Sequence, residues 1–378
     1  MPNSFSSITK CLCKKYQMSV KVSVKINYMK NQIKKSFAIF ALITLGLLSS
    51  NAQTPSTTNT SSGYHLIKRI EVSGEGGWDY LFADSNAHRL YVSHATKVVV
   101  IDTEKDAVIG EIPNTNGVHG IAVAEDLGRG FISAGRDNAV TIFDLKTLKA
   151  IQIVKVGKNP DAILYDSATK QVFTFNGGSS DTSVIEAKTG KVVGTITLGG
   201  KPEFATADGK GIVFVNIEDK SEVVEIDSKK LTVKAHWSLS PGEEPSGMAI
   251  DRKNHRLFIV CSNKKMIVMN SENGKVVADL AIGDGTDAAA FDPDMKLAFS
   301  SNGEGNLTVI RQDSKDKFSV VETVTTQRGA RTMTLDTKTH KIYLPTAQFG
   351  ETPLPTADRP RPRPAIIPNS FVILVFGK

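Results

Sequence analysis

A short pattern recurs along this chain at nearly constant spacing, and it limits the available folds more than any other feature. Two apolar residues alternate with other residues and are followed by a closing position, which is Asp in six of the seven copies. The closing positions are Asp84, Ala124, Asp166, Asp208, Asp251, Asp292 and Asp336. The steps between them are 40, 42, 42, 43, 41 and 44 residues. A period in the range of about 20–50 residues is the signature of a repeat architecture, in which each unit buries its apolar face against its neighbours.

Each repeat contains several short runs that are typical of β-strands. Examples are "RLYVS" at 89–93, "VVVID" at 98–102 and "KVVGTI" at 191–196. These runs are rich in β-branched residues, are bounded by turn-forming residues and have no helical period. Four strands in about 42 residues are typical of a β-propeller blade. The sequence therefore predicts an all-β fold, a seven-bladed β-propeller of four-stranded antiparallel blades.

The two ends of the chain predict how such a ring closes. The seventh copy ends with the strand-like run 370–377 and is one strand short of a full blade. The run "HLIKRIEV" at 65–72 precedes the first copy and has no other partner. We expect this N-terminal strand to complete the last blade, which removes two open sheet edges.

Several of these runs resemble a known family. "RLYVSH", "VVVID", "GKVVGTI", "GGKPEF" and "GARTMTLD" are similar to the repeats of the YVTN-repeat, YncE-like β-propellers, which are exported bacterial proteins, and the resemblance extends over residues 67–378. It implies the same fold and an exported protein. Most relatives have no established reaction, and DNA binding has been attributed to part of the family.

The N-terminal segment reads as a leader. Residues 29–52 have a basic start, an apolar core over residues 37–48 and small residues before Gln53, which is the order of a cleaved signal peptide. The apolar core is too short to span a bilayer. We therefore divide the chain into a leader (1–52), a flexible linker (53–63) and the propeller (64–378). We expect the mature protein to be periplasmic or secreted and not inserted in a membrane.

Removal of the leader changes the charge of the protein. The formal net charge of +7 includes eight lysines and no acid in residues 1–52, so the remainder has 38 basic and 39 acidic groups. A general electrostatic affinity for nucleic acid or anionic membrane is therefore not indicated. Cys261 is the single cysteine beyond the leader, which excludes an intramolecular disulfide, and its apolar context predicts a buried, inert thiol.

The run "DAILYD" at 161–166 shows what the acids of each repeat are expected to do. The second acid closes the innermost strand, where its carboxylate accepts hydrogen bonds from turn amides. The first acid opens the same strand at the mouth of the central channel. One residue per blade occupies this opening position, and the seven are Asp79, His119, Asp161, Glu203, Ser246, Asp287 and Arg331.

This ring of residues is the candidate ligand-binding site. Four carboxylates in a small circle should raise at least one carboxyl pKa, and they favour a small polar or cationic ligand such as a divalent metal ion or a polyamine. Arg331 would orient an anionic group of the ligand. The alternative is that the ring only solvates the channel mouth and caps loop amides.

Two further features lie on the same face of the predicted propeller. His94 is in the expected loop between the second and third strands of blade 1 and is a candidate ligand contact. In blade 7 the corresponding loop, which we call the blade-seven loop (residues 346–369), has 24 residues and six prolines. Its Arg359, Arg361 and Arg363 alternate with proline, which favours an extended segment that presents positive charge to a partner, unless its apolar ends simply pack across the blades.

The sequence leaves three functions open. It contains no phosphate-binding Gly-Lys-Ser/Thr loop, His-Glu-x-x-His motif, Gly-x-Ser-x-Gly motif or paired-cysteine metal spacing. The first hypothesis is a binding protein for a small ligand or a protein partner at the channel mouth. The second is a metal-dependent, lactonase-like hydrolase that uses His119 with Asp161 or Glu203. The third is DNA binding through the arginines of the blade-seven loop.

Overall fold

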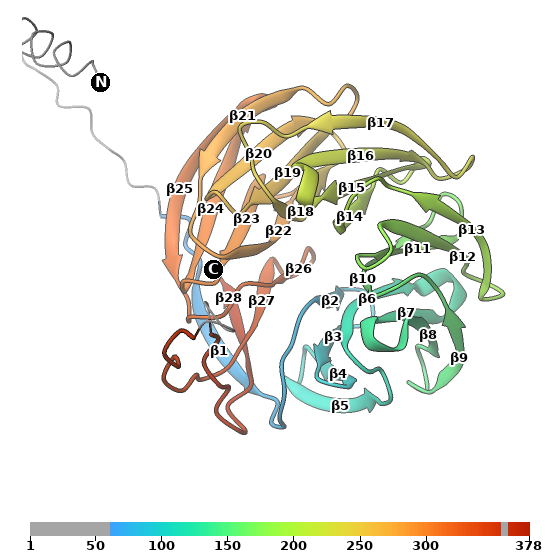
Figure 1. Ribbon diagram of the computed structural model, residues 1–378. Coiled ribbons are helices and arrows are strands. Elements are labelled where there is room, and N and C mark those ends of the chain that lie inside the picture. Colours follow the sequence, from blue (N-terminus) through green and yellow to red (C-terminus); the bar gives the residue numbers. More distant parts are fainter. Residues whose placement is uncertain (1–60, 357–361) are drawn as a thin grey trace, which may run out of the picture. The chain divides into compact units, whose positions relative to one another are not determined.

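The protein folds into a ring of seven four-stranded antiparallel sheets around a central channel, as the repeats predict (Figure 1). The computed structural model describes residues 61–356 and 362–378. The leader, most of the linker, Arg359 and Arg361 lie outside the described residues. In the part of the chain that is described, no helix is both long and apolar enough to cross a membrane.

The blades follow one another along the chain, with the innermost strand first. Blade 1 comprises β2 (Leu81–Asp84), β3 (Arg89–His94), β4 (Lys97–Asp102) and β5 (Ala107–Ile112). Blade 2 comprises β6 (Val118–Ala124), β7 (Arg129–Ala134), β8 (Ala139–Asp144) and β9 (Ala150–Lys155). Blade 3 comprises β10 (Pro160–Asp166), β11 (Gln171–Asn176), β12 (Asp181–Glu186) and β13 (Lys191–Thr197). Blade 4 comprises β14 (Pro202–Ala207), β15 (Ile212–Ile217), β16 (Glu222–Asp227) and β17 (Thr232–Ser238).

The remaining blades have the same order of strands. Blade 5 comprises β18 (Pro245–Asp251), β19 (Arg256–Cys261), β20 (Lys265–Asn270) and β21 (Val276–Ala281). Blade 6 comprises β22 (Thr286–Asp292), β23 (Leu297–Asn302), β24 (Asn306–Ser314) and β25 (Lys317–Thr325). Blade 7 is made of β26 (Thr334–Asp336), β27 (Lys341–Thr346), β28 (Val372–Gly377) and β1 (His65–Glu71).

The ring closes in blade 7, where β1 is the outermost strand. It runs antiparallel to β28, with Ile70 opposite Ile373 and Leu66 opposite Phe376. The first strand of the chain and the last therefore lie side by side in one sheet (Figure 1). The end of the linker is also held in place, because the backbone N–H of Ser62 donates to a carboxylate oxygen of Glu322 at 2.7 Å.

The core consists of seven apolar clusters, one between each pair of neighbouring blades. The second and third strands of the blades are buried on both faces, whereas the outermost strands are largely exposed. The cluster between blades 7 and 1 joins Tyr343 and Ile373 to Leu90 and Ile101, so apolar packing also crosses the closure point. Cys261 is fully buried in the cluster between blades 4 and 5, and burial raises its pKa to about 12, as expected for an inert thiol.

The closing aspartates hold the turns that follow the innermost strands. Asp84 accepts from the backbone N–H groups of Asn86 and Ala87, at 3.1 and 2.9 Å. The other five, Asp166, Asp208, Asp251, Asp292 and Asp336, make equivalent bonds. In blade 2, where Ala124 replaces the acid, the chain instead forms a short 3-10 helix over Glu125–Leu127. The structural role predicted for the closing acids is therefore confirmed.

Candidate functional site: the channel mouth

The seven opening residues lie at irregular points of the innermost strands. In five blades the pairing between the first and second strands shifts register at the opening residue. The five are His119, Asp161, Glu203, Ser246 and Asp287. Asp79 and Arg331 precede the first paired residue of β2 and β26. A bulge takes a residue out of the ladder and re-aims its side chain, which frees these side chains to point toward the channel mouth.

Side chains near the innermost strands fix the backbone of this ring. The hydroxyl of Thr332 donates to the Asp79 carbonyl at 2.8 Å, and the Asn216 amide donates to the Ser246 carbonyl at 2.7 Å. The hydroxyls of Ser133 and Ser301 donate in the same way to the carbonyls of Asp161 and Arg331. Small residues follow several opening residues because the strands approach closely there. A Cβ added to Gly247 would lie 2.5 Å from the Ala288 Cα.

Three of the ring residues form a tight cluster. Nδ1 of His119 lies 2.6 Å from Oδ2 of Asp79 and 3.6 Å from Oδ1 of Asp161. One ligand atom from each of the three residues lies within 4.8 Å of the others, which is close enough for all three to hold one metal ion. Oδ1 of Asp161 is buried and has no hydrogen-bond partner, so the cluster retains an unused acceptor.

The other two acids of the ring are paired with basic side chains, and one of these, Lys201, is shared with Glu218. Nη1 of Arg331 donates to Oδ2 of Asp287 at 2.5 Å, and Nη2 of Arg331 lies 3.7 Å from Oδ1 of Asp79. Nζ of Lys201 lies 2.7 Å from Oε1 of Glu203. Lys201 was not predicted as a site residue. The sequence signal that could have identified Lys201 is its position two residues before Glu203, in the run "KPEF". These pairs concentrate the unpaired negative charge around His119.

Ser246 is the uncharged member of the ring. Its hydroxyl donates to the Thr286 carbonyl of blade 6 at 3.2 Å, so it links two neighbouring innermost strands. This is a structural contact and contributes no charge to the site.

Burial shifts the ionisation of the ring. Burial raises the pKa of Asp161 to about 6 and that of Asp287 to about 7, although His119 and Arg331 respectively oppose the rise. Burial, together with the charge of Asp161, raises the pKa of Glu203 to about 8. Burial alone would lower the pKa of His119, but the hydrogen bond with Asp79 and the nearby carboxylates raise it. The prediction of at least one raised carboxyl pKa is therefore confirmed, with burial rather than crowding of like charges as the main cause, and the raised pKa values favour bound protons.

The floor of the ring is a tyrosine that sequence reasoning missed. Tyr80 is buried and meets Phe204 edge to face across the channel, with ring centroids 5.2 Å apart. Burial and the charges of all four ring acids raise its pKa, so its hydroxyl stays protonated. Beyond this contact the channel contains a cavity of about 500 Å³, lined in part by Ala162 and Met333. The Tyr80–Phe204 contact thus lies between the charged mouth and this cavity, whose lining is mixed and also includes Ser167, Thr206 and Arg252.

The structure corrects the position expected for His94. It is the last residue of β3, only 1% exposed, and its ring stacks on Phe371 at a centroid distance of 4.2 Å. Burial, followed by the charge of Lys97, lowers its pKa to about 4, so the ring is neutral at neutral pH. The prediction that His94 presents its side chain to a ligand is therefore wrong, because the long blade-seven loop leads back into β28 and brings Phe371 over it.

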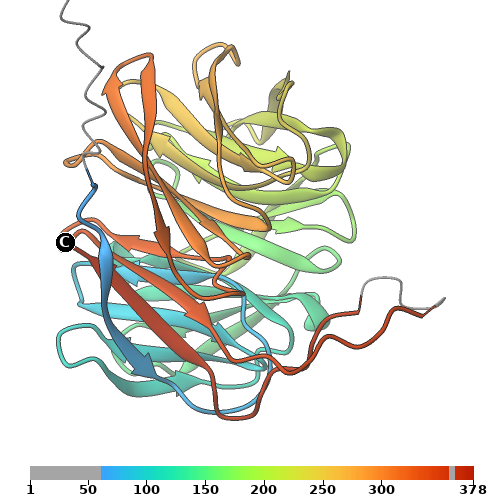
Figure 2. The same ribbon diagram turned by 90° about the vertical axis from the view of Figure 1, so that its left-hand side faces the viewer.

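The described parts of the blade-seven loop, residues 346–356 and 362–369, extend away from the ring of blades (Figure 2). Its base is held by a β-bridge between Phe349 and Ile366. Of its three arginines, Arg363 lies within the described residues, and it lines a pocket together with Arg331. The same pocket contains Trp78 and Arg328, which sequence reasoning missed.

Together, fold and site define a class: a seven-bladed β-propeller with a charged, tyrosine-floored channel mouth. The family model of the cytochrome D1 heme domain matches residues 83–299, more than half of the chain, so this protein belongs to that family. Similar solved structures include the hydrazine synthase of Kuenenia stuttgartiensis, with a TM-score of 0.63 at 16% identity, covering 72% of this chain and 94% of that one. The structure of U3-55K matches with a TM-score of 0.67 at 8% identity, covering 82% and 98%. At such identities these two likenesses show the fold alone. No curated protein matches the chain.

The family name raises the question of haem, and the channel mouth does not fit one. A haem iron in a protein usually takes an axial ligand such as histidine. His119 is the histidine of the mouth, but its Nδ1 contacts Asp79, and a Cβ added to Gly135 would lie 2.9 Å from its Nε2. The ring carboxylates would also repel haem propionates. We therefore assign no haem chemistry to this site.

Proposed function

We propose that this protein is an exported binding protein whose channel mouth holds a divalent cation between Asp79, His119 and Asp161. The observation that carries the proposal is the mutual distance of the three ligand atoms, which all lie within 4.8 Å of one another. We also propose that the protein is exported and that it is related to the YVTN-repeat, YncE-like β-propellers. Both proposals are supported by the order of the leader residues and by the resemblance of the repeats.

The charge of the mouth favours a dication. The ring contains four carboxylates, and Lys201 and Arg331 neutralise two of them. When all four carboxyl groups are ionised and His119 is neutral, the ring carries two negative charges more than Lys201 and Arg331 balance, and Asp79 and Asp161 are the acids that contact His119. One divalent cation would balance them.

The donor set favours zinc over magnesium or calcium. Two carboxylates and one imidazole are a mixed oxygen and nitrogen set, whereas magnesium and calcium prefer oxygen alone. Three protein ligands leave a coordination position open to the channel mouth, the usual arrangement where a metal also binds a small ligand. The cation would displace the proton shared between His119 and Asp79.

Calorimetric titration with Zn²⁺ tests this proposal. The wild-type protein should bind one Zn²⁺, and Asp79→Asn or Asp161→Asn should weaken binding by more than the roughly 10–100-fold that loss of a supporting residue costs. Wild-type affinity should rise between pH 5 and pH 8, because protons must leave Asp161, with its pKa of about 6, and His119, whose pKa is also raised. Mn²⁺ serves as the comparison ion.

Asp284→Asn is the matched control, since Asp284 is an exposed acid that pairs with Lys264 at 3.0 Å just before β22. It should leave zinc affinity unchanged. Equal affinities in the wild type, Asp79→Asn and Asp161→Asn would refute the metal site and leave the ring as solvation of the channel mouth.

A hydrolase of the lactonase type is the second candidate. It is favoured by the open coordination position of a metal ion held by Asp79, His119 and Asp161, which would bind and activate a water molecule. The zinc-loaded protein would then hydrolyse lactones or esters, and His119→Gln would abolish the activity. A zinc-loaded protein without such activity would support the binding protein alone.

A further inference from the structure

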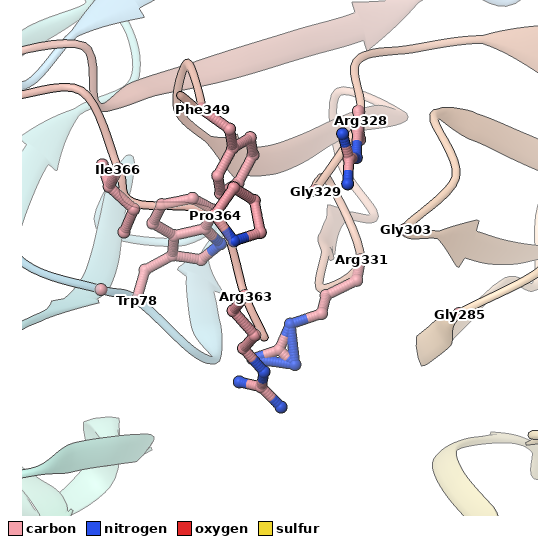
Figure 3. Close-up of a pocket in the computed structure, with 11 residues that line it drawn as sticks. Trp78, Gly285, Gly303, Arg328, Gly329, Arg331, Phe349, Arg363, Pro364 and Ile366 are labelled. Carbon is pink, nitrogen blue, oxygen red and sulfur yellow. The ribbon is translucent and has the colours of Figure 1, made fainter. Parts of the chain in front are cut away.

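The pocket beside the ring is formed by the blade-seven loop and the turns around blades 6, 7 and 1. Its volume is about 410 Å³, within the range of small-molecule sites. The lining residues used below are Trp78, Arg328, Arg331, Phe349, Arg363 and Pro364 (Figure 3). Glycines form much of the rest of its wall, so backbone and aromatic rings define its shape.

Three arginines give this pocket a positive charge that the described residues compensate only in part. Arg331 is paired with Asp287 and Asp79. Arg328 and Arg363 are exposed, and no carboxylate among the described residues forms an ion pair with either. Figure 3 shows the guanidinium group of Arg363 next to that of Arg331. An anion between these groups would relieve their mutual repulsion and accept charge-assisted hydrogen bonds.

An aromatic wall lies next to these charges. Trp78 lies 6.1 Å from Phe349 and 5.2 Å from Phe371, measured between ring centroids. Pro364 lies beside the indole of Trp78 (Figure 3). The bridge between Phe349 and Ile366 holds the loop over this wall. A flat ring could therefore rest against Trp78 and Phe349 while its charged group reaches the arginines.

We propose that this pocket binds a small aromatic organic anion of one or two rings. Its carboxylate or phosphate group lies between Arg363 and Arg331, its ring packs against Trp78 and Phe349, and Arg328 adds positive charge from the other side of the pocket (Figure 3). The site lies beside the Asp79–His119–Asp161 cluster, to which Arg331 connects it through Asp79, and it does not require a metal ion. Carboxylates and phosphate esters share this recognition chemistry, and the choice of probe distinguishes them.

Trp78 itself reports on the pocket. The chain has two tryptophans, Trp78 and Trp237, so Trp237→Phe leaves Trp78 as the single indole fluorophore. In this background, and with a chelator present, the protein is titrated with 4-nitrobenzoate, which is planar, anionic and a fluorescence quencher. Phenyl phosphate is then added as a competitor. The neutral isostere 4-nitrobenzamide measures ring binding without charge.

We expect 4-nitrobenzoate to quench Trp78 saturably and at least tenfold more tightly than 4-nitrobenzamide. Arg363→Gln should weaken this binding at least fivefold and Arg328→Gln by a smaller factor, with unchanged melting temperatures because both side chains are exposed. Unsubstituted benzoate serves as a second competitor. If phenyl phosphate displaces 4-nitrobenzoate at a lower concentration than benzoate does, the natural ligand is assigned to phosphate esters, and the reverse order assigns it to carboxylates.

Arg136→Gln is the matched control, since Arg136 is an exposed arginine in the turn between β7 and β8, outside the pocket. Equal quenching by the benzoate and the benzamide would overturn the proposal. So would equal weakening by Arg136→Gln and Arg363→Gln, because binding would then follow overall charge. A failure of zinc binding at the ring would not alter either result.

Discussion

The innermost strands of blades 3 and 6 carry the same acid at both ends, in different surroundings. In blade 3, Asp166 is fully buried and accepts from the Ala168 N–H at 3.1 Å, the Thr169 hydroxyl at 2.8 Å and the Ser228 hydroxyl at 2.6 Å. Asp161, five residues earlier, has a buried oxygen with no hydrogen-bond partner. Donors aimed at a carboxylate stabilise its charge, whereas burial without donors disfavours that charge.

The pKa values express the same contrast. Burial would raise the pKa of Asp336, a closing residue, but hydrogen bonds from Ser85, Thr339 and the turn amides lower it. Burial raises the pKa of Asp287, an opening residue, to about 7. Closing acids are therefore parts of the fold, whereas the opening acids Asp161, Glu203 and Asp287 have raised pKa values and favour a bound proton.

Removal of a closing acid should have the largest effect on stability. Asp166→Ala leaves the buried Ser228 hydroxyl without its acceptor, which costs about 1–3 kcal/mol, and removes the bonds from the Thr169 hydroxyl and the Ala168 N–H, worth about 0.5–1.5 kcal/mol each. We expect the free energy of unfolding to fall by about 3 kcal/mol, measured by urea denaturation. A loss below about 1 kcal/mol would show that the turn does not depend on its aspartate.

Removal of an opening charge should have a smaller effect of the opposite sign. The raised pKa of Asp161, about 6, means that the folded state favours its protonated form. Its contribution to stability is thus present at acid pH and is lost as pH rises through about 6. Asp161→Asn should therefore stabilise the metal-free protein by roughly 1–2 kcal/mol at pH 8 and by little at pH 4. Urea denaturation at both pH values measures this difference, and a loss of stability at pH 8 would contradict it.

The sequence predicted the fold and the ring because both follow from local periodicity. The repeat of about 42 residues determines the number of blades, and its constant spacing assigns one opening residue to the start of each innermost strand. The bases that neutralise the ring were harder to predict. Arg331 occupies the opening position of its repeat. Lys201 lies two residues before the opening position of its own repeat, and the contact of Lys201 with Glu203 depends on the course of the loop.

Features that depend on packing between distant segments could not be predicted. From the sequence, His94 is simply a polar residue at the end of a strand. In the structure its ring is covered by Phe371, which lies far along the chain. Trp78 and Arg328 gave no periodic signal, because the pocket that they share exists only where the blade-seven loop crosses the closure of the ring. Period-based reasoning finds positions that recur in every blade, and it misses contacts that occur in one blade alone.

The most direct test of this account is a pH titration of aspartate carboxyl carbons by nuclear magnetic resonance, with and without Zn²⁺. We predict that Asp161 titrates near pH 6 and Asp287 near pH 7, while Asp336 titrates below its ordinary value of 3.8. Zn²⁺ should abolish the titration of Asp161 and leave that of Asp336 unchanged. Titration of Asp161 and Asp287 near pH 4, with no response to Zn²⁺, would contradict the distinction between the two ends of the strand.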